Sequence, residues 1–364
     1  MTRLVLKVGS ALLVAPDGAV RRDWLRSLVA DVAARVRAGE QAVIVSSGAI
    51  ALGARRLGLA RGGRASLEDA QAAAAVGQIA LAGVWAELLA GEGLTAAQML
   101  VTLDDLEDRR RFLNASATFD RLLSLGVVPV VNENDSVATT EIRFGDNDRL
   151  AARVAQAAGA KTVILLSDVD GLYTANPKTD PDATRFAEVR HITPQIEAMA
   201  SADSASGMGS GGMVSKLQAA KIATKAGADL IIVSGQHDHP LERLARGEGG
   251  TRFMAAPPAR ARKGWLAGRL TAKGQLHIDA GAARALGSGK SLLAAGIVRI
   301  EGKFERGDVV DIIAPDGAAI ARGLAEYDSR DGLAIAGLSS AAIGAKLGAP
   351  PRAAFVHRDH MVML

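Results

Sequence analysis

Short apolar runs alternate with longer helical patterns over the first 235 residues. The apolar runs predict buried strands at residues 4–9, 42–48, 126–135, 161–171 and 228–235. Between them, the spacing of apolar and alanine residues predicts helices at 21–38, 67–90 and 104–125. Strands separated by helices imply βαβ units. The expected fold is therefore α/β, a three-layer αβα sandwich around a mostly parallel sheet.

The rhythm changes near residue 250. Segment 246–264 is rich in Gly, Pro and Arg and has no periodicity, which is typical of a linker. The short glycine-bounded apolar runs beyond it predict a compact β-rich barrel. We therefore expect a first domain at 1–250, a linker at 251–272, a β-rich domain at 273–350 and a C-terminal tail at 351–364.

Composition removes several classes of function. The chain has no cysteine, which excludes disulfides, thiolate metal sites and cysteine nucleophiles. Its N-terminus, MTRLVLKVGS, lacks the apolar stretch of a signal peptide. No uninterrupted apolar run approaches the roughly 18 residues that span a bilayer. A cytoplasmic protein without a membrane partner is expected.

The net charge of +4 hides an uneven distribution. Residues 252–306 contain eleven Lys/Arg against three Asp/Glu, which leaves 32 against 36 elsewhere. A basic β-rich module can bind RNA through its phosphates. The favoured alternative is a solubilising surface, or one that faces an acidic neighbouring domain. Trp265, Phe304 and Tyr327 are the few aromatic candidates for base stacking, which weakens the case for single-stranded RNA.

Polar residues follow the predicted strands, and ligands bind at the carboxyl ends of strands in such sheets. Lys7 precedes the turn at Gly9 and Ser10, where an ammonium group can reach phosphate oxygens. Ser47 and Gly48 precede a helix whose first N–H groups can bind an anion. The alternatives are a solvent-facing lysine and an ordinary serine N-cap.

Two polar clusters lie farther along the chain. Residues 132–135 (NEND) follow a buried run and residues 144–148 read FGDND. Such groups can hold an amino group, orient lysines or serve Mg²⁺. The alternative is a pair of Asx-turn loops. Ser167 and Asp168 end a further strand, where an ordinary βα loop is the alternative.

The glycine-rich stretch 207–216 (GMGSGGMVSK) is the strongest phosphate signal. Its glycines expose backbone N–H groups, and Lys216 lies in the first turn of the helix that follows. A cation is unfavourable there by the helix dipole alone, so an anion nearby is expected. The alternative is a flexible loop with a solvated lysine. The stretch also contains G-x-G-x-x-G, but no buried strand precedes it, which argues against a dinucleotide site.

The motifs occur in a distinctive order. They are LKVGS (6–10), VSSGAIALG (45–53), VNENDSVAT (131–139), FGDND (144–148), SDVDGLYTANP (167–177) and SGMGSGGMVSKLQAA (206–220). This array resembles the amino acid kinase family, and within it the kinases that phosphorylate glutamate in proline biosynthesis. The phrases at 98–115 and 358–361 support the same resemblance. Residues 273–349 resemble a PUA domain.

The resemblance implies ATP-dependent phosphorylation of the γ-carboxylate of glutamate. Lys7 and Lys216 would clamp the transferred phosphoryl group, and Asp148 would hold both lysines. The residues implied to bind glutamate are Ser47, Gly48, Asn132, Asp135 and Asn147. Those implied to bind ATP are Lys7, Ser167, Asp168, Ser210, Gly211, Gly212, Met213, Val214, Ser215 and Lys216. Mg²⁺ would arrive with the ATP phosphates rather than on a dedicated protein site.

Elementary chemistry agrees with this reading, because an ionised carboxylate needs no general base and phosphoryl transfer depends on positioning and charge neutralisation. The resemblance also implies feedback inhibition by proline, a reductase partner for the unstable acyl phosphate, and a homo-oligomer. Two alternatives stay open. One is a related acceptor (acetylglutamate, aspartate or carbamate). The other is an RNA-binding protein whose kinase-like fold is inert.

Overall fold

A computed structural model describes residues 2–15, 18–137, 146–177, 179–204, 212–255, 272–348, 350–352 and 354–364. The chain divides into two compact units. The first contains Met1–Glu107 and Ala115–Ala256, and the second contains Asp108–Asn114 and Pro257–Leu364. Each unit has its own sheet and its own hydrophobic core, so each is described by itself.

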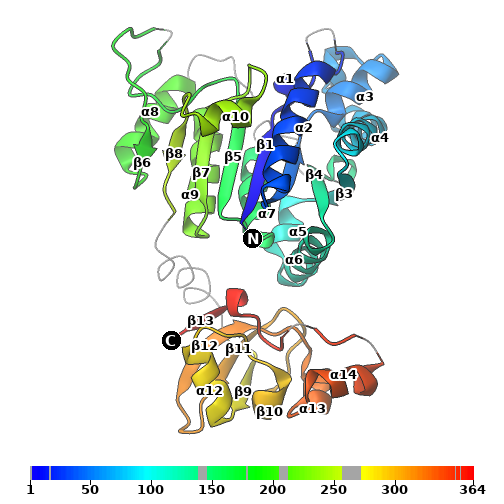
Figure 1. The fold of residues 1–364 in the computed structure, drawn as a ribbon, viewed down its shortest axis with the longest axis vertical. Coiled ribbons are helices and arrows are strands. Elements are labelled where there is room, and N and C mark those ends of the chain that lie inside the picture. Colours follow the sequence, from blue (N-terminus) through cyan, green and yellow to red (C-terminus); the bar gives the residue numbers. More distant parts are fainter. Residues whose placement is uncertain are drawn as a thin grey trace. The chain divides into compact units, whose positions relative to one another are not determined.

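The described residues of the first unit form an eight-stranded sheet in the order β3-β4-β2-β1-β5-β7-β8-β6 (Figure 1). Its strands are β1 Arg3–Val8, β2 Gln41–Ser46, β3 Thr95–Val101, β4 Val127–Glu133, β5 Thr162–Ser167, β6 Glu188–Val189, β7 Asp229–Ser234 and β8 Thr251–Phe253. Every neighbouring pair is parallel except β7 and β8. The predicted mostly parallel sheet is confirmed.

Helices surround this sheet. Those before residue 256 are α1 Ser10–Leu13, α2 Arg22–Arg37, α3 Ala49–Leu57, α4 Leu67–Gly91, α5 Leu103–Glu107, α6 Arg109–Ser124, α7 Asp146–Ala157, α8 Pro194–Ser204, α9 Met213–Lys225 and α10 Pro240–Ala245. Leu6 and Val8 of β1 share one core cluster with Trp24 of α2. Because side chains alternate along a strand, Lys7 points to the opposite face of the sheet. Its ion-pair partner there comes from α7.

Helices α3 and α4 touch backbone to backbone. A Cβ atom added at Gly53 would lie 1.7 Å from the carbonyl oxygen of Ala73. One added at Gly77 would lie 1.8 Å from the carbonyl oxygen of Ala49. Only glycine fits at these two positions, since any side chain would force the helices apart. The N-terminus of α3, where Gly48 is the cap, is thus fixed by α4.

Helix α4 is long and apolar enough, by length and composition, to cross a membrane. Core helices of soluble proteins pass the same test, and α4 places Leu81, Trp85 and Leu89 in the hydrophobic core beside β2 and β4. Its N-terminus is capped by Ser66, whose side chain accepts a hydrogen bond from the Asp69 N–H group. We therefore read α4 as a core helix.

Two local expectations differ from the structure. The single helix expected at 104–125 is broken into α5 and α6 at Asp108, whose carboxylate accepts a hydrogen bond from Arg111 N at 3.0 Å and begins the second helix. Strand β3 was not expected. It lies at the sheet edge, is mostly exposed or half-buried, and lacks the apolar alternation that identifies a strand.

The second unit is built on a five-stranded sheet in the order β10-β9-β11-β12-β13. Its elements are β9 Gly274–Ile278, α12 Ala280–Gly287, β10 Ile297–Gly302, β11 Val309–Ile313, β12 Ala319–Leu324, α13 Ser329–Ile335, α14 Ser340–Leu347 and β13 Met361–Met363. Strand β13 pairs with β12, so part of the segment expected as a separate tail belongs to this sheet. Likewise β8, expected in the linker, pairs with β7. Most of the expected linker lies outside the described residues.

A half-buried carboxylate in the second unit links the stability of that unit to pH. Glu326 forms ion pairs with Arg306 at 3.2 Å and His360 at 3.7 Å. Burial would raise the pKa of Glu326, but the interactions with His360 and Arg306 outweigh it and lower the pKa below 4.5. The ionised carboxylate therefore stabilises the fold above pH 4.5, and this contribution is lost as the pH falls through the lower folded-state pKa.

We expect Glu326→Gln to lower the free energy of unfolding at pH 7 by about 1.5–3 kcal/mol, the usual contribution of a hydrogen bond to a charged group. Urea unfolding at several pH values would measure this, and the difference from the unsubstituted protein should shrink below pH 4.5. Asp316→Asn is the control, because that carboxylate is exposed. A difference that persists unchanged at low pH would contradict the role of the charge.

Candidate active site

The candidate site lies where β1, β2 and β5 end side by side. Val8 of β1 is in register with Ser46 of β2 and with Leu166 of β5. The residues that follow these strands therefore meet at one edge of the sheet, as expected for a parallel sheet. This edge carries the predicted residues Lys7, Ser47, Gly48, Ser167 and Asp168.

The centre of the site is a carboxylate held between two lysines. Lys7 Nζ lies 2.6 Å from Asp148 Oδ1, and Lys216 Nζ lies 3.6 Å from Asp148 Oδ2. The Asp148 side chain is 1% exposed, and the two lysine side chains are 11% and 10% exposed. Three elements supply these groups, namely β1, α7 and α9. Two ammonium groups against one carboxylate leave a net positive charge, which suits an anionic ligand.

The first turn of α7 explains how Asn147 and Asp148 reach different partners. The described part of the FGDND cluster, residues 146–148, forms the start of α7. Asn147 Nδ2 donates to Ser47 Oγ at 2.7 Å and to the Ser46 carbonyl at 3.3 Å. Asn147 Oδ1 is buried and accepts no hydrogen bond from the described residues. A buried acceptor without a donor is uncommon, and it suits a ligand that brings its own N–H group.

Asn132 lies near the end of β4 and Asp135 follows that strand, but the two residues differ in their contacts. Asn132 Nδ2 donates to Gln78 Oε1 at 2.7 Å, and its Oδ1 accepts from Glu133 N at 2.9 Å. The amide of Asn132 is thus engaged within the protein. Asp135 is buried in a short 3₁₀ turn, Asp135–Val137. Burial lowers the pKa of Arg64, and the negative charge of Asp135 opposes that shift.

A small cavity lies between α4 and strands β3 and β4. Its volume is about 120 Å³. Both polar and apolar side chains line it, among them Ser46, Gln78, Gln98 and Asn132. Trp85 Nε1 donates to Ser46 Oγ at 2.9 Å, so a side chain of α4 holds the end of β2. The sequence gives no signal for Gln78 or Trp85, because their roles depend on how α4 packs.

Two of the expected nucleotide residues, Ser167 and Asp168, lie at the end of β5. Ser167 Oγ donates to Asp168 Oδ1 at 3.0 Å and accepts from Val169 N at 3.4 Å. Helix α9 starts after Gly212 and places Met213, Val214 and Ser215 in its first turn. Ser210 and Gly211 lie outside the described residues.

The loop after β7, which contacts Ser167 and Asp168 at the end of β5, is not identified from the sequence. Gly235 N donates to the Ser167 carbonyl at 2.7 Å. Gln236 Nε2 donates to the Asp168 carbonyl at 3.1 Å. The rule that ligands bind at strand ends applies equally to the strand expected at 228–235, so it could have identified this loop.

Comparisons with known proteins cover both units. Residues 2–234 match the model of the amino acid kinase family, and residues 274–347 match that of the PUA domain. The chain is 66% identical over 362 residues to a glutamate 5-kinase of Sphingopyxis alaskensis, covering 100% of this chain and 97% of the relative. It is 62% identical to a glutamate 5-kinase of Zymomonas mobilis, covering 100% and 91%. Identity to that of Novosphingobium aromaticivorans is 59%, covering 100% and 96%.

Proposed function

Since this chain belongs to the amino acid kinase family, we propose that its site transfers the γ-phosphoryl group of ATP to the γ-carboxylate of glutamate. The observation that carries the proposal is the convergence of Lys7 and Lys216 on Asp148, from elements far apart in the sequence. Full-length similarity to glutamate 5-kinases supports glutamate as the acceptor.

In the proposed reaction a γ-carboxylate oxygen attacks the γ-phosphorus, and the bond from that phosphorus to the β,γ-bridging oxygen breaks to release ADP. The acceptor is already ionised at neutral pH, because an ordinary Glu carboxyl has a pKa of about 4.3. A general base is therefore not required. The lysine pair neutralises charge that spreads over the migrating group, and Asp148 keeps the ammonium groups where that charge develops.

The glutamate subsite is proposed at the start of α3 and α7. The Ser47 hydroxyl and the Gly48 N–H group stand at the N-terminus of α3, where a carboxylate is favoured. Asn147 Oδ1 can accept a hydrogen bond from the α-amino group, and Asp135 supplies negative charge. Ser167 and Asp168 are proposed to hold ATP with its Mg²⁺, which would supply further charge neutralisation on the phosphates.

We expect Asn147→Ala to raise KM for glutamate about 10- to 100-fold, while KM for ATP changes less than about twofold. The substitution removes an acceptor, Asn147 Oδ1, that has no donor among the described residues, and it removes the donor that orients Ser47 Oγ. A hydrogen bond to a charged group is worth about 1.5–3 kcal/mol. Steady-state kinetics with each substrate varied would measure the two constants. Gln156→Ala, on the same helix, is the control. An unchanged KM for glutamate would remove Asn147 from the subsite.

The acceptor is tested by ADP release with glutamate, acetylglutamate, aspartate or carbamate as the second substrate. Release that depends on glutamate supports the proposal, and faster release with another acceptor overturns it. Repeating the glutamate assay with proline tests the proposed feedback inhibition at the same subsite.

We also propose a cytoplasmic homo-oligomer and a reductase that consumes the acyl phosphate. For the basic residues of 252–306, a solubilising or interdomain surface is favoured, and RNA binding is the alternative. A salt-dependent gel shift that requires residues 252–364 would support RNA binding. No shift at low salt would end it, and the kinase proposal would be unaffected.

A further inference from the structure

The loop between β7 and α10, residues 235–239, joins the nucleotide end of the site to a distant helix face. At its start, Gly235 and Gln236 bind the backbone of Ser167 and Asp168. A Cβ atom at Gly235 would lie 2.4 Å from Leu12 Cδ1 and 3.1 Å from Leu166 Cβ. The loop thus packs closely against α1 and β5, and its path determines whether Gln236 can reach the Asp168 carbonyl.

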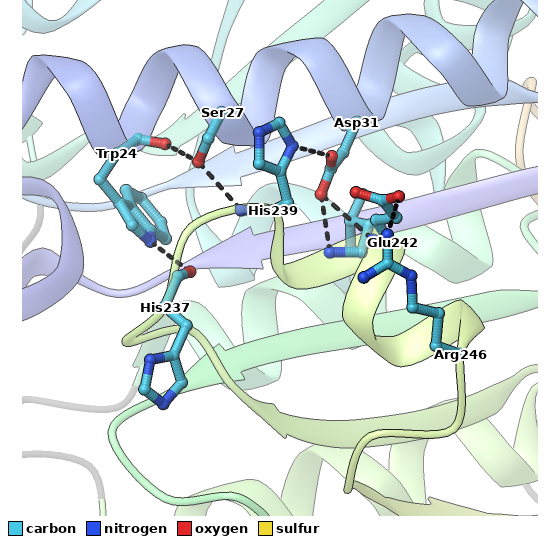
Figure 2. Close-up of polar contacts among 8 residues, drawn as sticks. Trp24, Ser27, Asp31, His237, His239, Glu242 and Arg246 are labelled. Atoms are coloured by element: carbon cyan, nitrogen blue, oxygen red, sulfur yellow. Dashed lines mark hydrogen bonds and ion pairs between the residues drawn. The ribbon is translucent and has the colours of Figure 1, made fainter.

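The far end of the loop is held by one face of α2 (Figure 2). Trp24 Nε1 donates to the His237 carbonyl at 3.1 Å. Ser27 Oγ accepts from His239 N at 3.1 Å and donates to the Trp24 carbonyl at 2.8 Å. These residues and Asp31 follow one another at spacings of three and four, so they line one side of the helix.

Asp31 makes the strongest of these contacts. Its Oδ1 lies 2.8 Å from His239 Nδ1, and its Oδ2 accepts from Leu241 N at 2.9 Å and Glu242 N at 3.2 Å. The residue is only 7% exposed. A buried carboxylate is costly unless donors surround it. All three donors come from His239 and the start of α10, so Asp31 is matched to this loop rather than to its own helix.

His239 carries backbone strain that these contacts maintain. Its φ of 54° and ψ of 51° lie in the left-handed region, which is unfavourable for a residue with a side chain. Such a conformation persists only where neighbouring groups fix it. Loss of the contacts to Ser27 and Asp31 would allow the loop to relax away from this geometry.

The imidazole also makes the contact dependent on pH. The pKa of His239 is raised from 6.5, first by its hydrogen bond to Asp31, while burial opposes the shift. The negative charges of Asp31, Glu242 and Asp238 raise the pKa further. Around it, α2 contributes Asp31, α10 contributes Glu242 paired with Arg246, and the loop contributes Asp238. The ion pair between protonated His239 and Asp31 is therefore present at low pH. It is lost as the pH rises through the raised pKa of His239.

A metal site is the alternative for this cluster, because ligand atoms of Asp31, His239 and Glu242 lie within 4.8 Å of one another. However, both oxygens of Asp31 are engaged by His239 and backbone N–H groups. Glu242 is paired with Arg246. These contacts already satisfy the ligand atoms, so the positioning role is favoured.

We infer that Trp24, Ser27 and Asp31 are positioning residues for ATP, which act by holding the β7–α10 loop so that Gln236 fixes the Ser167–Asp168 backbone. The inference rests on the proposed function only in assigning Ser167 and Asp168 to ATP. Glutamate binds elsewhere in that proposal, at the starts of α3 and α7. Loosening the loop should therefore weaken ATP binding and leave glutamate binding unchanged.

The test compares Asp31→Asn and Gln236→Ala with Asp23→Asn, a control on an exposed part of the same helix. Asp31→Asn keeps the shape but removes the charge, and we expect KM for ATP to rise about tenfold with little change in kcat or in KM for glutamate. Gln236→Ala should raise KM for ATP in the same way without touching α2. In the unsubstituted enzyme, KM for ATP should also rise with pH above 6.5, and this dependence should be lost in Asp31→Asn.

Direct titration with ADP in the absence of glutamate separates the two proposals. If the unsubstituted protein does not bind ADP, the proposed function fails. If it binds ADP and both variants bind it equally well, the positioning role alone is overturned. If KM for ATP and KM for glutamate rise together, or the variants only lose stability in urea, Asp31 is purely structural and the inference is wrong.

Discussion

Replacing Lys216 with alanine is expected to lower kcat by about 10²-fold or more and to leave KM for glutamate nearly unchanged. The Lys216 ammonium group is held 3.6 Å from Asp148 Oδ2 and is largely buried. Its proposed contact with the migrating phosphoryl group strengthens only as charge develops on that group. Interactions of this kind raise kcat rather than ground-state affinity. Steady-state kinetics at saturating ATP would measure the loss.

Lys221→Ala is the matched control for this prediction. Lys221 lies on the same helix, is more exposed, and pairs with Glu197 at 2.7 Å, outside the site. It should retain normal kcat. A Lys216→Ala enzyme with near-normal kcat would remove Lys216 from the chemistry, whatever its effect on ATP binding.

Asp148→Asn is expected to lower both kcat and stability. The substitution keeps the size of the side chain but removes the negative charge that lies between two nearly buried ammonium groups. Breaking a buried ion pair by removing one partner costs about 3–5 kcal/mol of unfolding free energy. The lysines should also move apart, so we expect kcat to fall by about 10²-fold or more, as for loss of a preorganised contact. Urea unfolding and kinetics would measure the two effects.

The double variant Asp148→Asn with Lys216→Met provides an internal check. Removing one of the two neighbouring ammonium groups should restore part of the lost stability, so the two changes should not be additive. Asp182→Asn, in an exposed turn, serves as the control. Additive losses of stability would show that Asp148 does not act through Lys216.

The centre of the site could be predicted because its residues follow buried strands or a glycine-rich stretch. Lys7 at the end of β1 and Lys216 at the start of α9 were identified in this way, and the structure brings both to Asp148. Parallel strands account for the place of Lys7, since their carboxyl ends meet at one edge.

Contacts that depend on helix packing could not be predicted. Gln78 engages Asn132, and Asp31 engages His239, through helices whose rotation and register are set by the whole core. Asp31 in particular reads as an ordinary polar position of an amphipathic helix. Its burial and its partners, more than 200 positions away in the sequence, follow only from the packing of α10 against α2.

The glycine contact between α3 and α4 limits how the site can be redesigned. No side chain separates the two backbones at Gly53 and Gly77. Helix α3 therefore cannot move closer to α4. A bulkier acceptor cannot be accommodated by displacing this helix. Altered acceptor preference must instead come from exchanging side chains that line the subsite, or from shortening them, on a rigid frame.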